Sequence, residues 1–190
     1  MALTKFLVAR YQLLTAIDLF LNDRDPVSVH TLAGAAREII EVLCRSAGIS
    51  PFMDEIRSNF PERSHKSLYE TVNLYRNSFK HAGAGKDDAD ILSQCSDEAN
   101  DYLLYVCTED YLRLRKAAPI EIQVMHAWFA CMHFDRLAPA VDKTRWLPLF
   151  PGIQGVSRLD AKRMALAALF EARLDEELMS HPKTEPSALS

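Results

Sequence analysis

The sequence has no uninterrupted run of about 20 apolar residues, the length that a membrane-spanning helix needs. Its apolar N-terminal segment is interrupted by Lys5, Arg10 and Asp18, and no short apolar block is followed by a small-residue cleavage site. We therefore predict neither a membrane segment nor a signal peptide, and we expect the protein to be cytoplasmic.

Closely spaced cysteines are also lacking. The four cysteines, Cys44, Cys95, Cys107 and Cys131, lie far apart, and none belongs to a CxxC pair. In a chain without an export signal, such cysteines are usually buried thiols. We expect four free thiols rather than a disulfide framework.

The signatures of several enzyme and cofactor classes are missing. There is no glycine-rich phosphate loop, no GxSxG and no HExxH. His126 and His133 are seven residues apart, about 10 Å along a helix, which is too far for one metal ion. We predict no cofactor and no metal, and we expect these histidines in the core or at an interface. The net charge of −4 gives no general attraction to DNA or RNA, so nucleic-acid binding would require a local patch.

Apolar residues recur at helical spacing through almost the whole chain. This periodicity predicts helices at about residues 3–22, 26–47, 64–82, 87–116, 120–137 and 158–179. Convincing strand alternation is absent. The predicted fold is all-α: an up-and-down bundle of four core helices with two additional C-terminal helices.

We expect one helical domain over residues 1–180, with the core bundle at about 1–116 and a helical extension at about 117–180. The polar tail at 181–190 should be disordered. The irregular stretch at 139–157 is too apolar for a free linker and should pack across the domain surface. Either the apolar helix at 120–137 or the segment 146–150 would also suit a dimer contact.

The helix predicted at 64–82 has two different faces. Leu68, Val72, Tyr75 and Phe79 fall within a narrow arc, which is the expected core-facing stripe. A second arc of about 140° carries amide, hydroxyl and basic groups but no carboxylate, which suits a phosphate ligand. Its members are Tyr69, Asn73, Arg76, Asn77, Lys80 and His81.

Four of these residues belong to the hexapeptide RNSFKH at 76–81. It resembles the signature of the HEPN superfamily of helical-bundle proteins, in which Arg and His are separated by four to six residues and a polar residue often follows the Arg. Arg76, Asn77 and His81 match these three positions, and the resemblance covers about residues 1–116. It implies a metal-independent endoribonuclease, or a derivative of one, whose motifs from two protomers meet at a homodimer interface. Single-stranded RNA or a nucleotide would be the ligand.

The resemblance also implies roles for the matched residues. His81 would transfer protons, Arg76 would bind the transition-state phosphate, and Asn77 would position them. Lys80, Asn73 and Tyr69 would help to bind or orient the substrate. The ribose 2′-hydroxyl would attack the adjacent phosphodiester and leave a cyclic phosphate.

The spacing alone is not specific. Arg24 and His30 also fit it, but that pair spans Pro26, the predicted start of a helix, and so lacks a helical platform. Arg76 and His81 could also have a purely structural role. His81 near a helix end would donate hydrogen bonds to free carbonyl groups of the last turn. The alternative function is a non-catalytic helical interaction module.

Overall fold

The structure is almost wholly α-helical, which confirms the predicted fold class. The computed structural model describes residues 2–59, 75, 79, 88–136 and 145–187. The longer described helices are α1 (Lys5–Leu21), α2 (Pro26–Ser46), α6 (Glu98–Arg115), α7 (Ile120–Met132) and α8 (Arg158–Leu174). The shorter described elements are α3 (Phe52–Asn59), α5 (Asp88–Ser93), β1 (Ala118–Pro119), η1 (Phe134–Arg136), η2 (Leu147–Leu149), η3 (Ile153–Gly155), α9 (Glu176–Ser180) and β2 (Thr184–Glu185).

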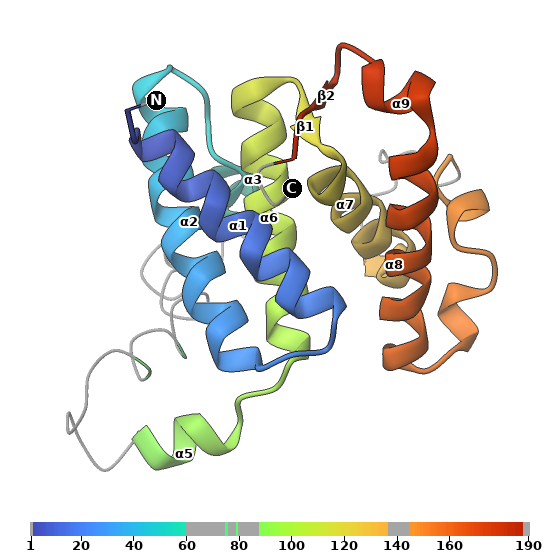
Figure 1. The fold of residues 1–190 in the computed structure, drawn as a ribbon. Coiled ribbons are helices and arrows are strands. Elements are labelled where there is room, and N and C mark those ends of the chain that lie inside the picture. The colour runs from blue at the N-terminus through green and yellow to red at the C-terminus, as the bar shows by residue number, and fades with distance from the viewer. Residues whose placement is uncertain (1, 60–74, 76–78, 80–87, 137–144, 188–190) are drawn as a thin grey trace.

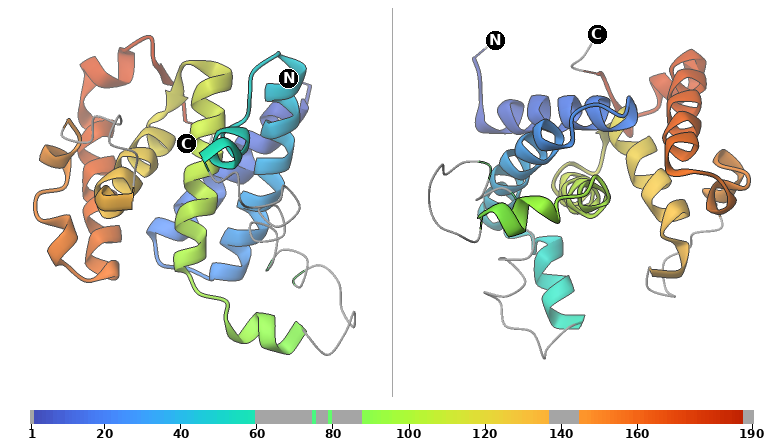
Figure 2. Two further views of the ribbon diagram at one scale, coloured as in Figure 1. Left: turned by 180° about the vertical axis from the view of Figure 1, so that it is seen from behind. Right: turned by 90° about the horizontal axis from the view of Figure 1, so that it is seen from below.

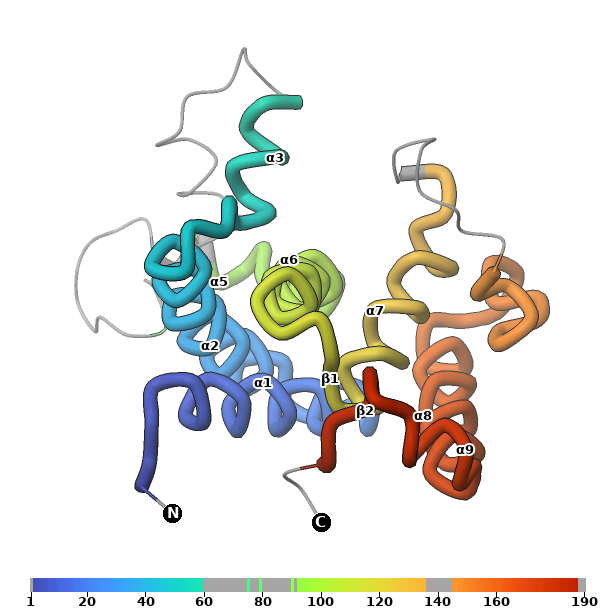
Figure 3. Tube along the Cα trace, turned by 90° about the horizontal axis from the view of Figure 1, so that it is seen from above, coloured from blue at the N-terminus to red at the C-terminus, as the bar shows by residue number. Residues whose placement is uncertain are grey.

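The helices form a bundle that extends from α2 on one side to α8 on the other (Figure 1). α1 and α2 lie side by side, and α6 packs against α2. Figure 2 and Figure 3 show α7 on the other side of α6, with α8 beyond it. None of the described helices is both long and apolar enough to cross a membrane.

The ends of the first two helices follow from local sequence. The Thr4 hydroxyl accepts a hydrogen bond from the Leu7 amide at 3.2 Å, at the start of α1. Asp25 caps α2 by accepting from the amides of Val27 and Ser28, and Pro26 is the first helical residue. After α2, Gly48 adopts φ +71°, a conformation that glycine reaches without strain.

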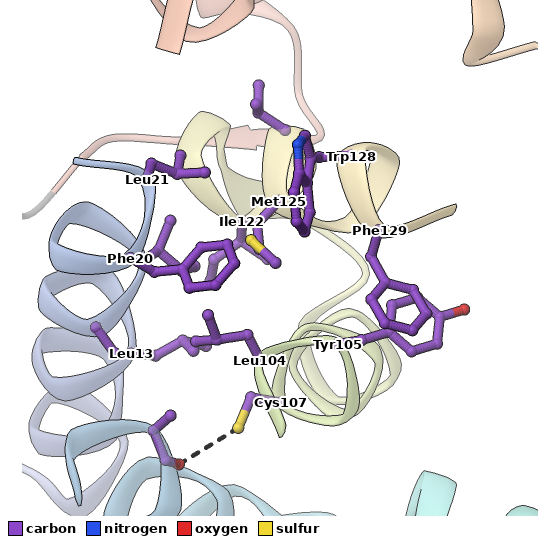
Figure 4. Close-up of a cluster of buried hydrophobic side chains, with 14 of the residues drawn as sticks. Leu13, Phe20, Leu21, Leu104, Tyr105, Cys107, Ile122, Met125, Trp128 and Phe129 are labelled. Atoms are coloured by element: carbon purple, nitrogen blue, oxygen red, sulfur yellow. Dashed lines mark hydrogen bonds between the residues drawn. The ribbon is translucent and has the colours of Figure 1, made fainter. Parts of the chain in front are cut away.

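The hydrophobic core is formed by residues of α1, α2, α6, α7 and α8, and Figure 4 shows part of it. Phe20 of α1 packs edge to face on Trp128 of α7, with ring centroids 5.4 Å apart. The Trp128 indole donates a hydrogen bond to the Ala161 carbonyl of α8 at 2.8 Å, so this buried ring keeps a polar partner. Tyr105 of α6 stacks on Phe129 of α7 at 4.1 Å. α7 is therefore a core helix. A dimer contact through residues 120–137 or 146–150 stays a prediction.

The helix predicted at 87–116 is broken between Ser93 and Glu98. The Gln94 carbonyl accepts the Tyr75 hydroxyl at 2.8 Å instead of continuing the helix. The Asp97 carboxylate is bound by Arg158 and Lys162 of α8, which holds the chain in its bend. The prediction of one continuous helix was wrong because these partners are distant in sequence.

Two later helices are also shorter than predicted. The segment 120–137 ends as α7 at Met132 and continues as the 3-10 turn η1. The segment 158–179 is divided into α8 and α9 at Asp175, whose carboxylate caps α9 by accepting from the Leu178 amide at 2.9 Å. In the stretch 145–157, Phe150 and Ile153 are buried, which confirms that this part packs on the domain.

The sequence predicts a disordered tail at 181–190, whereas the described part of the tail, residues 181–187, contacts the rest of the domain. Thr184 and Glu185 form β2, which pairs in parallel with Ala118 and Pro119 of β1. The Glu185 carboxylate accepts the Tyr111 hydroxyl at 2.6 Å. These contacts fix the tail between the N-terminal helices and α7.

Candidate functional site

The residues of the predicted Arg/His site lie outside the described residues. This holds for both proposed catalytic residues and for the residues expected to bind or orient a substrate. They are Tyr69, Asn73, Arg76, Asn77, Lys80 and His81. Their proposed roles therefore stay predictions from the sequence.

Two members of the same predicted helix are described, and they show which way its apolar stripe faces. Tyr75 and Phe79 are helical and half-buried. Both rings meet the imidazole of His30 on α2 edge to face, with centroids 5.7 Å apart in each case. The predicted core-facing stripe is confirmed at these two positions.

His30 is held rigidly beneath these rings. Only 4% of the residue is exposed, and its Nδ1 lies 3.0 Å from the Oδ1 of Asn100 on α6. Asn100 in turn donates to the Pro26 carbonyl at 3.2 Å. Arg24, the other member of the rejected pair, is exposed, and α2 begins between the two. This confirms that Arg24 and His30 share no helical platform.

A second group of ionisable side chains lies between α6 and α7. The Oε1 of Glu109 accepts both the Tyr105 hydroxyl and the Nε2–H of His126, each at 2.8 Å. We refer to these three residues as the Glu109 cluster. Burial opposes ionisation of Glu109, but the hydrogen bonds from His126 and Tyr105 outweigh it, so the pKa of Glu109 lies below its usual value. The carboxylate is an acceptor only, which places the imidazole proton on Nε2.

Aromatic rings enclose the Glu109 cluster. His126 stacks on Tyr105 at 5.2 Å and meets the edge of Trp146 at 5.4 Å. Phe52 of α3 meets Tyr105 edge to face at 5.7 Å. Burial and the adjacent Glu109 raise the pKa of Tyr105 far above its usual value, so this hydroxyl is a hydrogen-bond donor and not a proton acceptor.

The Glu109 cluster holds the His126 imidazole in one orientation through its Nε2. A cavity of about 440 Å³ is formed by residues 147–155, and Gln154 supplies its one polar side chain. Because it contains no titratable group, this cavity offers no acid–base chemistry.

The third ionic group joins α6 to α8. Asp101 is fully buried and accepts from both Arg158 and His133, at 2.7 Å and 2.9 Å for the same carboxylate oxygen. Asp97 accepts from Arg158 and Lys162. Burial opposes ionisation of Asp97, yet the hydrogen bonds from Lys162 and Arg158 outweigh it and hold its pKa below the usual range. Each of the five side chains in this group forms an ion pair or hydrogen bond with another member, which favours a structural role. They are Asp97, Asp101, His133, Arg158 and Lys162.

His126 and His133 thus each bind their own carboxylate, as expected of core or interface histidines. Within the described ranges, no group of three His, Cys, Asp or Glu side chains could hold a metal ion. Sequence periodicity did not identify either carboxylate partner. The signal in the sequence is a matched spacing. His126 and His133 are seven residues apart, and Asp101 and Glu109 are eight residues apart, so each histidine can meet one carboxylate when the two segments pack together.

Comparison with protein-family models, with curated proteins and with solved structures gives no match for this chain. The HEPN resemblance therefore rests on the residues of the sequence motif.

Proposed function

We propose that this protein is a HEPN-like, metal-independent endoribonuclease that acts as a cytoplasmic homodimer. The observation that carries the proposal is the hexapeptide RNSFKH, which matches the family signature at Arg76, Asn77 and His81. Tyr75 and Phe79 support its helical context, because both are helical and pack on His30 as core-facing residues should. Each protomer would contribute its motif to one composite site.

In the proposed reaction, the ribose 2′-oxygen bonds to the adjacent phosphorus and the bond from phosphorus to the 5′-oxygen breaks. One proton leaves the 2′-hydroxyl and one reaches the departing 5′-oxygen, so no further reactant is consumed. His81 is assigned this proton transfer because imidazole titrates near neutral pH. Arg76 is assigned the transition-state phosphate, since its guanidinium matches two phosphate oxygens. Asn77 positions the two.

The remaining polar residues of the same arc are assigned to substrate binding. Lys80 supplies a positive charge for the RNA backbone, and Asn73 and Tyr69 supply hydrogen-bonding groups. Because the net charge of the chain is −4, this local surface would have to provide the attraction to RNA. Binding should therefore weaken steeply with added salt.

The test is cleavage of single-stranded RNA by the full chain with EDTA present. The proposal expects products with 2′,3′-cyclic phosphate ends, and their loss in His81→Ala and Arg76→Ala. His181→Ala and Arg24→Ala are matched controls, because both of these residues are exposed and lie outside the motif. Circular dichroism checks that each variant keeps its helices. RNA that survives equally with wild type and His81→Ala contradicts the catalytic proposal.

One observation favours the alternative, a non-catalytic interaction module. Phe170 and Leu174 of α8 are 61% and 63% exposed, which is unusual for large apolar side chains on one helix. Wild-type protein that leaves RNA intact but associates through α8 would favour this alternative over the ribonuclease.

A further inference from the structure

The C-terminal tail lies across the domain in the manner of a bound peptide. Residues 183–187 contact α1, α6, β1 and α7, all of which are at least 60 residues earlier in the chain. The strand β2 lies beside β1 and pairs with it in parallel (Figure 3). The Ala118 amide of β1 donates to the Lys183 carbonyl at 3.0 Å. An extended peptide adds to the edge of a sheet in the same way.

One carboxylate anchors the tail. Glu185 accepts the Tyr111 hydroxyl at 2.6 Å, and Tyr111 is fully buried. Arg10 and Arg115 form ion pairs with the same carboxylate, at 3.4 Å and 3.1 Å. The Arg10 guanidinium also donates to the Pro186 carbonyl. Two cations and one hydroxyl thus make a binding site for the carboxylate of an extended peptide.

Polar contacts alone hold the tail in this groove. Residues 183–187 read Lys-Thr-Glu-Pro-Ser and include no large apolar side chain. Thr184, Glu185 and Ser187 are half-buried, and the other two residues are exposed. The hydrophobic core described above contains none of them, so release of the tail leaves that core intact. A terminal segment of this kind opens at a cost far below that of global unfolding.

The groove has hydrogen-bonding groups that the tail does not use. Glu121 is 2% exposed, and its Oε1 accepts from Ser187 at 2.6 Å and from Arg173 at 2.8 Å. Its buried Oε2 has no hydrogen-bond partner among the described residues, and the same is true of the buried Nε of Arg10. A buried polar atom without a partner weakens the complex that contains it. The tail is therefore not the tightest ligand for this groove.

We propose that this groove binds an extended Glu-x-Lys segment of another protein, and that the chain's own tail is a tethered competitor for the same site. The glutamate of the partner replaces Glu185 between Arg10 and Arg115. The lysine of the partner replaces Ser187 and gives Glu121 a charged donor. Asp97 sets the precedent within this protein, because its carboxylate binds an arginine and a lysine together.

A second copy of this chain is a poorer occupant. Its tail would make the contacts that the tethered tail already makes, and would leave the same two atoms of Arg10 and Glu121 without partners. The tethered tail also has an effective concentration of about the millimolar range, which favours it over the identical segment of a free copy. A different segment with the added lysine overcomes this advantage.

This inference goes beyond the proposed ribonuclease and does not rest on it. Tyr75 and Phe79, the described residues of the predicted motif helix, pack on His30 of α2. The groove is formed by α1, α6, β1 and α7. Peptide binding and RNA cleavage can therefore each be lost without the other.

The first test measures binding of a free peptide to the full chain by fluorescence anisotropy. The probe is a labelled peptide of residues 181–190, HPKTEPSALS. Glu185→Ala weakens the hold of the tethered tail, so this variant should bind the peptide about tenfold more tightly than wild type does. Ser187→Glu places a second carboxylate beside Glu121 and should act in the same direction. Glu177→Ala, at an exposed position, is the control and should bind as wild type does. Peptide that binds none of these proteins, or all of them equally, overturns the proposal.

The second test examines the chemistry of the partner, with the Glu185→Ala chain as receptor. A peptide that carries Ser187→Lys should bind about tenfold more tightly than the tail sequence, and one that carries Glu185→Ala about tenfold more weakly. Addition of Arg10→Ala to the receptor should weaken binding, whereas Arg24→Ala, at an exposed position, should not. A lysine peptide that gains no affinity overturns the Glu-x-Lys assignment. Wild-type dimers that the free tail peptide dissociates would identify a second copy as the occupant and overturn the assignment to another protein.

Discussion

Arg158 and Asp101 form a two-bond ion pair that joins α8 to α6. The two guanidinium nitrogens donate to the two carboxylate oxygens at 2.7 Å and 2.5 Å. Asp101 is fully buried, and the Arg158 guanidinium also lies 5.4 Å from the ring of Phe20 on α1. One arginine thus connects three helices that are distant in sequence.

Removal of this arginine should strongly destabilise the fold. Arg158→Ala leaves the buried carboxylate of Asp101 with His133 as its remaining partner, and we expect a loss of about 3 kcal/mol in the free energy of unfolding. Urea denaturation measures it. Arg163→Ala is the control on the same helix, since its ion pair with Asp160 is exposed and should contribute little. An Arg158→Ala protein as stable as this control would contradict the structural role.

Asp110 should make wild-type stability depend on pH. Its Oδ1 accepts the Phe52 amide at 2.6 Å, while its buried Oδ2 has no hydrogen-bond partner among the described residues. Burial raises the pKa of Asp110 from 3.8 to about 6. The folded state holds the proton on Asp110 more tightly than the unfolded state does. The contribution of Asp110 to the free energy of unfolding therefore falls as pH rises from about 4 to above 6.

The comparison with Asp110→Asn isolates this effect. We expect the free energy of unfolding of wild type, relative to that of the variant, to fall by up to roughly 3 kcal/mol over this pH range. Asp54→Asn is a control of opposite sign, because the hydrogen bond from Arg45 lowers the pKa of Asp54. Relative to Asp54→Asn, wild type should gain stability as pH rises. Parallel pH profiles for all three proteins would contradict the assignment.

Residue periodicity predicted the helices and much of what faces inward. Tyr75 and Phe79 were placed on a core stripe by spacing alone, and both pack against α2. The break before α6 left no comparable signal. Its cause is the binding of Asp97 by Arg158 and Lys162, which are 61 and 65 residues further along the chain. Local propensity cannot report a bond between such distant residues.

The same limit applies to the candidate sites. The chemistry of the RNSFKH arc could be deduced from side-chain types on one helix, whereas the Glu109 cluster needs α6 and α7 to be adjacent. The packing of the described part of the tail is a further example. Residues near Glu185 are polar and resemble a free chain end. Yet the hydroxyl of Tyr111, 74 residues earlier, donates a hydrogen bond to the Glu185 carboxylate.

The tail should therefore contribute measurable stability through Glu185. Glu185→Ala removes the acceptor for the buried Tyr111 hydroxyl and a partner of Arg115, and we expect a loss of about 1–3 kcal/mol in the free energy of unfolding. Tyr111→Phe should add less in the Glu185→Ala background than alone, because the hydroxyl has then lost its acceptor. Glu177→Ala, at an exposed position, is the control. Strict additivity would show that this bond contributes nothing.

The cysteines should divide into one reactive and three protected thiols. Cys44, Cys107 and Cys131 are buried, and burial raises their pKa values to about 11, 12 and 11. Cys107 also donates to the Ala33 carbonyl at 3.4 Å (Figure 4). Burial and the nearby Asp97 raise the pKa of Cys95 as well, but Cys95 is partly exposed. Titration of the native protein with a thiol reagent at pH 8 should therefore modify one thiol per chain before the other three, and four after unfolding. Cys95→Ser should abolish the rapid phase while the count after unfolding falls to three. A rapid thiol that persists in this variant would show that one of the buried cysteines is accessible in the native state.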